Sequence, residues 1–192
     1  MENFEELRQA YDKYILILKK FFPESVDAID AMETDLGERL FLAPRDTTPD
    51  LGGIPGGLVS FSLDVARQTK IFREAVNHRS LVRVALLHEV GRLGGPLVTQ
   101  DLFLTETSDW HREKLNRNYK YNEACPKMST SHRTLFYIAK YGFKVSMEEW
   151  VAILTSAGFQ YDENRFYANE NLPLASALQM CRTLTFNEMK QR

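Results

Sequence analysis

An imidazole and a carboxylate stand side by side where an apolar stretch of the sequence ends. His88 and Glu89 follow Leu86 and Leu87, and Arg92 comes shortly after them. Neutral imidazole nitrogen and carboxylate oxygen both bind divalent cations, so this pair is a natural start for a metal site. Whether it can support metal-assisted chemistry depends on which other ligands the fold brings beside it.

A helix must present these two side chains. Ser80 is a typical capping residue, and the apolar residues after it recur at helical spacing. We therefore expect a helix from Ser80 that carries His88 on its apolar face and that ends near Gly91. A histidine on such a face can also be a buried structural side chain, so both interpretations stay open.

The spacing of apolar residues predicts helices along most of the remaining chain. These helices are expected at residues 4–21, from Pro23 to about Gly37, at 56–72, from Ser131 to Phe143, after the Ser146 and Glu149 capping box, and from Pro173. Residues 43–57, rich in proline and glycine, predict a long loop, and residues 98–124 predict a small β-hairpin or an irregular insertion. The predicted fold class is mostly α, with six or seven helices in one bundle.

Length and composition limit the class of protein. The chain has 192 residues and a net charge of −2, which suits a globular domain without a general attraction to nucleic acid or membrane. Its two cysteines, Cys125 and Cys181, do not form a disulfide framework. The N-terminus is acidic where a signal peptide is basic, and no apolar run is long enough to span a bilayer. We expect a cytoplasmic protein without a membrane partner.

The charge is unevenly distributed along the chain. Residues 1–50 hold twelve acids and six bases, whereas residues 111–140 hold seven bases and two acids. Such a segment predicts a local basic surface. With Tyr119 and Tyr121 nearby, it could contact the phosphates and bases of a nucleic acid, although a basic run is more often a solvated face.

Four short motifs follow one another along the chain. They are Gly-Gly-Leu-Val-Ser-Phe-Ser-Leu at residues 56–63, Leu-Leu-His-Glu-Val-Gly-Arg at 86–92, Ser-His-Arg at 131–133 and Ala-Leu-Gln-Met-Cys-Arg at 177–182. In this order they resemble the G-G-L-L-E-H-S-L, L-L-H-D-x-G-K, G-H-G-E and A-L-H-x-A-D segments of the HD-domain metal-dependent phosphohydrolases of bacteria and their phages. The resemblance covers roughly residues 40–186. It implies an HD-like helical domain at 43–192, on which helices of residues 1–42 pack.

Carried over residue by residue, the resemblance implies metal ligands at His88, Glu89 and His132. Two histidines and one carboxylate can hold a divalent ion such as Mn, Mg, Fe or Zn. If the site is active, the protein would be a single-metal phosphohydrolase of nucleotides, with Glu89 and Arg92 in catalytic roles and Lys114 or Arg117 orienting phosphate.

The chain also departs from the family pattern. The family's first metal-binding histidine falls at Phe61, its fourth-helix histidine falls near Thr155 or Ser156, and its terminal aspartate falls at Arg182. Arg182 would place a permanent positive charge beside the metal ion. At an effective dielectric of ~20, two like unit charges about 4 Å apart repel by roughly 4 kcal/mol, and the repulsion is larger for a doubly charged ion. The favoured expectation is therefore that no metal cofactor binds and that Glu89 pairs with Arg92 or Arg182.

Three functional hypotheses follow from these residues. The first is a catalytically degenerate binding or regulatory module, of a kind that a phage could encode, whose partner is a nucleotide, a phosphorylated small molecule or a protein. Its candidate ligand-binding residues are Arg92, Lys114, Arg117, Arg133 and Arg182. The second is the reduced phosphohydrolase described above, and the third is a nucleic-acid-binding helical protein.

Overall fold

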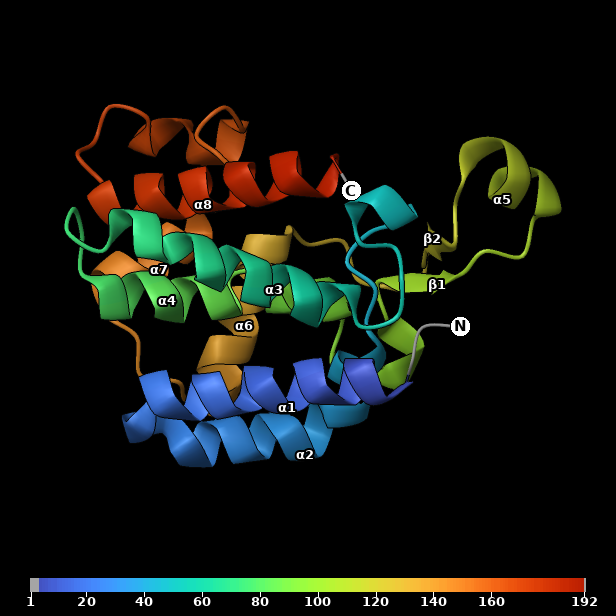
Figure 1. Ribbon diagram of the computed structural model, residues 1–192, viewed down its shortest axis with the longest axis horizontal. Helices are drawn as coiled ribbons and strands as arrows, with labels where there is room; N and C mark the ends of the chain where they lie inside the picture. Colours follow the sequence, from blue (N-terminus) through green and yellow to red (C-terminus); the bar gives the residue numbers. More distant parts are fainter. Residues whose placement is uncertain (1–3, 192) are drawn as a thin grey trace.

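Eight α-helices form most of the computed structural model, which describes residues 4–191 (Figure 1). They are α1 Phe4–Phe21, α2 Val26–Leu42, α3 Gly57–Gln68, α4 His78–Leu87, α5 Asp109–Leu115, α6 Thr130–Tyr141, α7 Met147–Leu154 and α8 Pro173–Met189. The mostly α class predicted from the sequence is confirmed. Within residues 4–191, no helix combines the length and the apolar character needed to cross a membrane.

The first two helices lie against each other at one side of the bundle (Figure 1). The prediction that the second helix stops near Gly37 is wrong, because α2 continues to Leu42. Gly37 lies inside the helix where the other helix comes close: a Cβ atom there would lie 3.0 Å from the Tyr11 hydroxyl oxygen. The glycine therefore permits close packing and does not end the helix.

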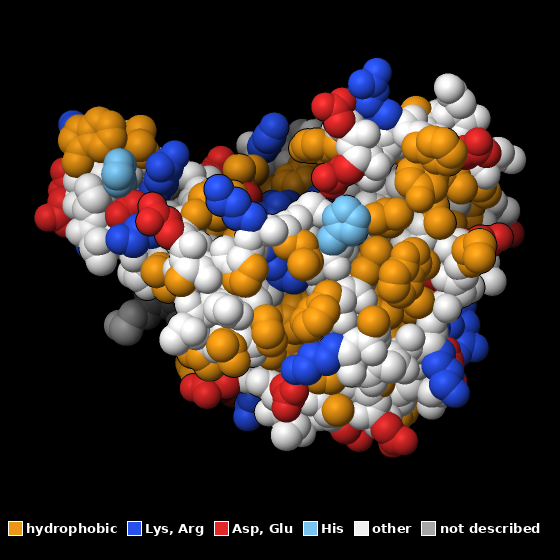
Figure 2. Space-filling model, turned by 180° about the vertical axis from the view of Figure 1, so that it is seen from behind, with side chains coloured by type: hydrophobic (Ala, Val, Ile, Leu, Met, Phe, Trp, Pro, Cys, Tyr) orange, Lys and Arg blue, Asp and Glu red, His pale blue; other side chains and the backbone are white. Residues whose placement is uncertain are grey.

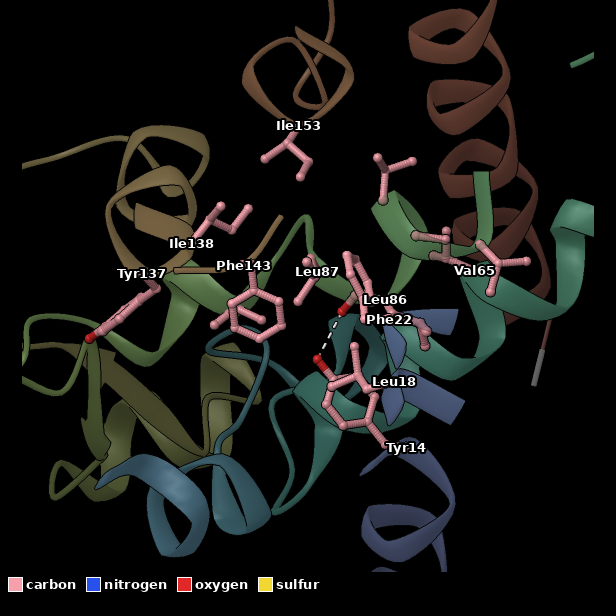
Figure 3. Packing of buried hydrophobic residues seen from close by; sticks show 14 of the residues in the cluster. Tyr14, Leu18, Phe22, Val65, Leu86, Leu87, Tyr137, Ile138, Phe143 and Ile153 are labelled. Carbon is pink, nitrogen blue, oxygen red and sulfur yellow. Dashed lines mark hydrogen bonds between the residues drawn. The ribbon is translucent and has the colours of Figure 1, made fainter. Parts of the chain in front are cut away.

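One continuous cluster of buried apolar side chains joins α1 and α2 to the rest of the bundle. It contains residues of α3, α4, α6, α7 and α8 as well (Figure 3). Within this cluster the Tyr14 hydroxyl donates a hydrogen bond of 2.9 Å to the backbone carbonyl of Leu86 in α4. The first two helices are thus tied by packing and by a buried hydrogen bond to the helix that precedes His88.

Helix α4 begins three residues earlier than the sequence suggested. Its cap is Asn77, whose side-chain oxygen accepts a hydrogen bond from the backbone N–H of Ser80. The predicted starts of the last two helices are confirmed. Ser146 and Glu149 form a reciprocal capping box at α7, and Pro173 is the first residue of α8.

A two-stranded sheet with a short helix between its strands projects from the bundle (Figure 1). Strand β1, Phe103–Thr105, pairs antiparallel with β2, Tyr119–Tyr121, which confirms the predicted small β element. Helix α5 between them was not predicted as a helix. It is a seven-residue helix whose Ser108 cap accepts a hydrogen bond from the backbone of His111. We refer to residues 103–121 as the arm.

Candidate functional site

The turn that carries His88 and Glu89 is packed tightly on α6. Helix α4 ends at Leu87, and a short 3-10 helix, η4 (Val90–Leu93), follows. A Cβ atom on Gly91 would lie 2.2 Å from the Thr130 carbonyl oxygen, so only glycine permits this approach. The Thr134 hydroxyl accepts a 2.9 Å hydrogen bond from the Gly91 N–H and donates one of 3.1 Å to the His88 carbonyl. These contacts fix the direction of the His88 and Glu89 side chains.

The Glu89 carboxylate lies at the centre of three guanidinium groups. Arg45 approaches it with two nitrogens, Nε at 2.7 Å from Oε2 and Nη2 at 3.0 Å from Oε1. Arg92 Nε lies 3.0 Å from Oε2, and Arg182 Nη2 donates to Oε1 over 2.8 Å. We refer to these four residues as the arginine cluster. The sequence predicted that Glu89 pairs with Arg92 or Arg182, and in the structure it pairs with both.

The arginine cluster keeps Glu89 ionised although it is buried. The residue is 1% exposed, and burial alone would raise the pKa of its carboxyl group. The charges of Arg45, Arg92 and Arg182 outweigh that penalty and hold the pKa of Glu89 well below its usual value. A buried carboxylate is tolerated when such partners surround it.

Arg45 is the member of the arginine cluster that the sequence did not reveal. It lies in the loop between α2 and α3 and is 2% exposed. Its guanidinium carbon lies 4.0 Å from the centre of the Phe61 ring and 4.4 Å from that of Phe186. Phe61 is the position at which the resemblance expects the first metal-binding histidine. A guanidinium held between aromatic rings and a carboxylate therefore occupies this region.

The three predicted metal ligands are not brought together. His88 is fully buried, with Nδ1 2.9 Å from the Ala85 carbonyl oxygen, and burial lowers its pKa to about 3. His132 is exposed at the start of α6, where its Nδ1 lies 2.7 Å from the Ser129 hydroxyl. Residues 4–191 contain no group of three or more His, Cys, Asp or Glu side chains suited to a metal ion.

The donors around Glu89 do not fit a divalent cation. Both carboxylate oxygens already contact guanidinium nitrogens, and a metal ion would add to three fixed positive charges. Neutral His88 could offer one nitrogen, but a stable site needs several ligands. The residues around Glu89 therefore do not form a site for a catalytic metal ion.

The other predicted ligand-binding residues lie in different places. Arg133 is buried and donates to the carbonyls of Gly91, Pro126 and Met128, so it supports the backbone around the turn. Lys114 and Arg117 are exposed at the outer part of the arm and line neither of the pockets beside the arginine cluster. Their predicted role beside Arg92 in orienting phosphate does not match this placement.

Two adjoining pockets open beside the arginine cluster, with cavity volumes of about 330 and 360 Å³. Both are lined by Arg92, Ser156, Ala157, Tyr161 and Arg182. The smaller also reaches Glu89 and the first residues of α6, and the larger reaches Arg45 and Asp46. Figure 2 shows the side of the molecule on which a hollow separates the arm from the main body, with Lys and Arg side chains inside it.

The fold divides the seven bases of residues 111–140. Arg133 is buried, and Lys140 pairs with Asp35 of α2 at 2.9 Å. The four bases Arg112, Lys114, Arg117 and Lys120 stay together on the arm, with the acids Glu106, Asp109 and Glu113. Four bases and three acids leave the arm with a net charge of +1.

Comparison of the chain with family models, with curated proteins and with solved structures found no match. The HD-domain resemblance therefore stays a prediction from four short motifs. The chemistry of the arginine cluster and its pockets must be inferred from their own geometry.

Proposed function

We propose that the protein is a catalytically degenerate, HD-like binding protein that holds a phosphate-bearing ligand in the pockets beside the arginine cluster. One observation carries the proposal. Arg92 and Arg182 hold Glu89, the carboxylate a hydrolytic metal would need, and they also line an open cavity. The arrangement favours binding of an anion over activation of water by a metal.

The charges near the pockets favour an anion. Arg45, Arg92 and Arg182 stand against Glu89 and Asp46, whose Oδ2 lies 3.6 Å from Arg92 Nη1, which leaves an excess of one positive charge. Glu163 also lines the smaller pocket and offsets this excess there, whereas it does not line the larger pocket. Guanidinium groups match the planar oxygen pairs of phosphate and carboxylate.

The start of α6 adds neutral hydrogen-bond donors to the smaller pocket. Ser129, Thr130 and Ser131 line the smaller pocket, and α6 begins at Thr130. The first backbone N–H groups of a helix have no partner within the helix and carry partial positive charge. An anion between these groups and Arg182 would therefore meet fixed donors from two elements.

Ala157 offers a test that leaves the arginine cluster intact. It is exposed and lines both pockets. Titration calorimetry with inorganic phosphate and pyrophosphate at low ionic strength should give saturable binding to the natural chain. Ala157→Glu adds a negative charge to the cavity and should weaken that binding about tenfold or more, which corresponds to 1.4 kcal/mol.

Ala157→Gln is the matched control, because it has nearly the same shape without the charge. It should bind the two anions within a few-fold of the natural chain. Equal binding by Ala157→Glu and Ala157→Gln, or no binding of either anion, would contradict the proposed site. Stoichiometric Mn, Fe or Zn in the purified protein, lost on substitution of His88, would instead support a metal-dependent phosphohydrolase.

A further inference from the structure

Two aromatic rings and a carboxylate enclose the Arg45 guanidinium. The ring centres of Phe61 and Phe186 lie 4.0 and 4.4 Å from its central carbon and only 5.0 Å from each other, so the two rings are neighbours and do not lie on opposite faces of the group. Two nitrogens of Arg45, Nε and Nη2, contact the Glu89 carboxylate oxygens, and the third, Nη1, donates a 3.0 Å hydrogen bond to the Leu51 carbonyl. Only 2% of the residue is exposed, so water is almost excluded; Nη1 and Nη2 donate hydrogen bonds, and Nε lies within ion-pair distance of Glu89.

This surrounding selects a flat cation. A guanidinium offers a flat, weakly hydrated cationic surface to aromatic rings and a row of donors to a carboxylate, whereas an ammonium group is more strongly hydrated. A lysine ammonium is compact and would leave one or both rings without a cationic partner. A neutral planar group would fill the space but would leave Glu89 with less positive charge around it.

We propose that Phe61, Phe186, Glu89 and the Leu51 carbonyl form a guanidinium-binding site that Arg45 occupies from within the same chain. Its ligand class is a planar monovalent cation, in place of the divalent metal that the sequence resemblance implied. This proposal does not depend on the phosphate proposal, because the contacts of Arg45 with Phe61, Phe186, Glu89 and Leu51 are made within the chain, whether or not an anion enters the larger pocket, which Arg45 also lines.

The site also fixes the loop that supplies the cation. The Arg45 N–H donates to the Gly52 carbonyl at 2.8 Å, and the Gly53 N–H donates to the Thr48 carbonyl at 2.7 Å. A Cβ on Gly53 would lie 2.6 Å from Thr48 backbone atoms, so the loop folds tightly on itself. Binding of the guanidinium therefore orders a folded loop rather than a single side chain.

Chemical rescue tests the site directly. In the full chain, Arg45→Ala should lower the thermal unfolding midpoint. Millimolar methylguanidinium should then raise the midpoint of this variant in a saturable way and leave the natural chain unchanged. N-methylurea, which has the shape without the charge, and methylammonium, which has the charge without the plane, should have no saturable effect at the same ionic strength.

Arg73→Ala is the matched control, since it removes a guanidinium whose side chain is 68% exposed and is paired only at the surface with Glu74. Methylguanidinium should not affect its midpoint. Absence of saturable stabilisation of Arg45→Ala by methylguanidinium, or equal stabilisation by N-methylurea, would overturn the proposal.

A refolding measurement covers the case in which Arg45→Ala does not fold alone. Recovery of folded Arg45→Ala from denaturant in methylguanidinium, and not in N-methylurea or methylammonium, supports the proposal. Equally low recovery in all three overturns it. Adding Phe186→Leu to Arg45→Ala should weaken the methylguanidinium effect, because one of the two aromatic faces is lost.

Discussion

The arginine cluster and the arm contain the same types of charged side chain in opposite surroundings. Glu89 and Arg45 are 1% and 2% exposed, whereas the side chains of the Arg112 and Asp109 pair on the arm are 59% and 88% exposed. In water, the attraction within such a pair is mostly offset by hydration and by side-chain entropy. In the interior, removal of one partner leaves the other charge without compensation. The comparison indicates that burial, and not the number of ion pairs, decides which charges matter to this fold.

The largest effect on stability is expected for Glu89→Gln, which tests the contribution of the buried charges. The variant keeps the shape but leaves three guanidinium groups around a neutral side chain, and we expect a loss of about 3–5 kcal/mol in the free energy of unfolding. For a chain of this size the unfolding midpoint should fall by roughly 6–20 °C. Calorimetry or circular dichroism at pH 7 measures both quantities.

Glu113→Gln on the arm is the control for Glu89→Gln, and it should change the free energy of unfolding by no more than about 0.5 kcal/mol. Similar losses in the two variants would contradict the distinction between buried and exposed charges.

The next effect concerns pH and His88. The pKa of His88 is about 3 in the folded protein, against about 6.5 in an unfolded chain. Between these values only the unfolded state takes up the proton, so stability falls as the pH falls. This histidine should account for a loss of about 2 kcal/mol between pH 7 and pH 5. Glu89 acts in the same direction, but only below the ordinary carboxyl pKa of about 4.3.

Denaturant titrations of His88→Gln at pH 7 and pH 5 check this prediction. The variant should lose about 2 kcal/mol less than the natural chain over that interval. His132→Gln retains the buried His88 and should keep the natural chain's acid sensitivity. An unchanged pH dependence in His88→Gln would show that this imidazole does not control acid stability.

The smallest effect is expected on the arm. Lys114 and Arg117 are exposed, so the double variant Lys114→Ala, Arg117→Ala should alter the free energy of unfolding by about 0.5 kcal/mol or less. The same double variant tests the hypothesis that the arm binds nucleic acid. If the arm bound DNA through these two side chains, a plot of the logarithm of the binding constant against the logarithm of the salt concentration would become less steep by roughly 2 in the double variant. We expect no measurable salt-dependent binding of DNA by the natural chain, because three acids leave the arm with a net charge of only +1.

Local signals in the sequence were sufficient for most of the fold. The Ser146 and Glu149 capping box and Pro173 mark helix starts through backbone hydrogen bonds that neighbouring residues decide. Gly37 misled the prediction because its role depends on Tyr11 of another helix. Helix α5 was missed because seven residues carry too little helical periodicity to distinguish a helix from an irregular loop.

The site was only partly predictable for a related reason. The pairing of Glu89 with Arg92 and Arg182 followed from motif positions that the resemblance placed together. Arg45 lies in a loop, where no periodicity indicates whether a side chain is buried. The one available signal was the unusual length of the proline- and glycine-rich segment 43–57, which suggests a function but does not say which residue provides it.

The hydrogen bond from Tyr14 to the Leu86 carbonyl has a practical consequence for fragments of this protein. A chain that began at residue 43 would lose this donor and uncover the apolar faces that α1 and α2 now cover. Such a fragment should be prone to aggregation on expression. Limited proteolysis that releases the first helix should for the same reason be followed by rapid digestion of the remainder.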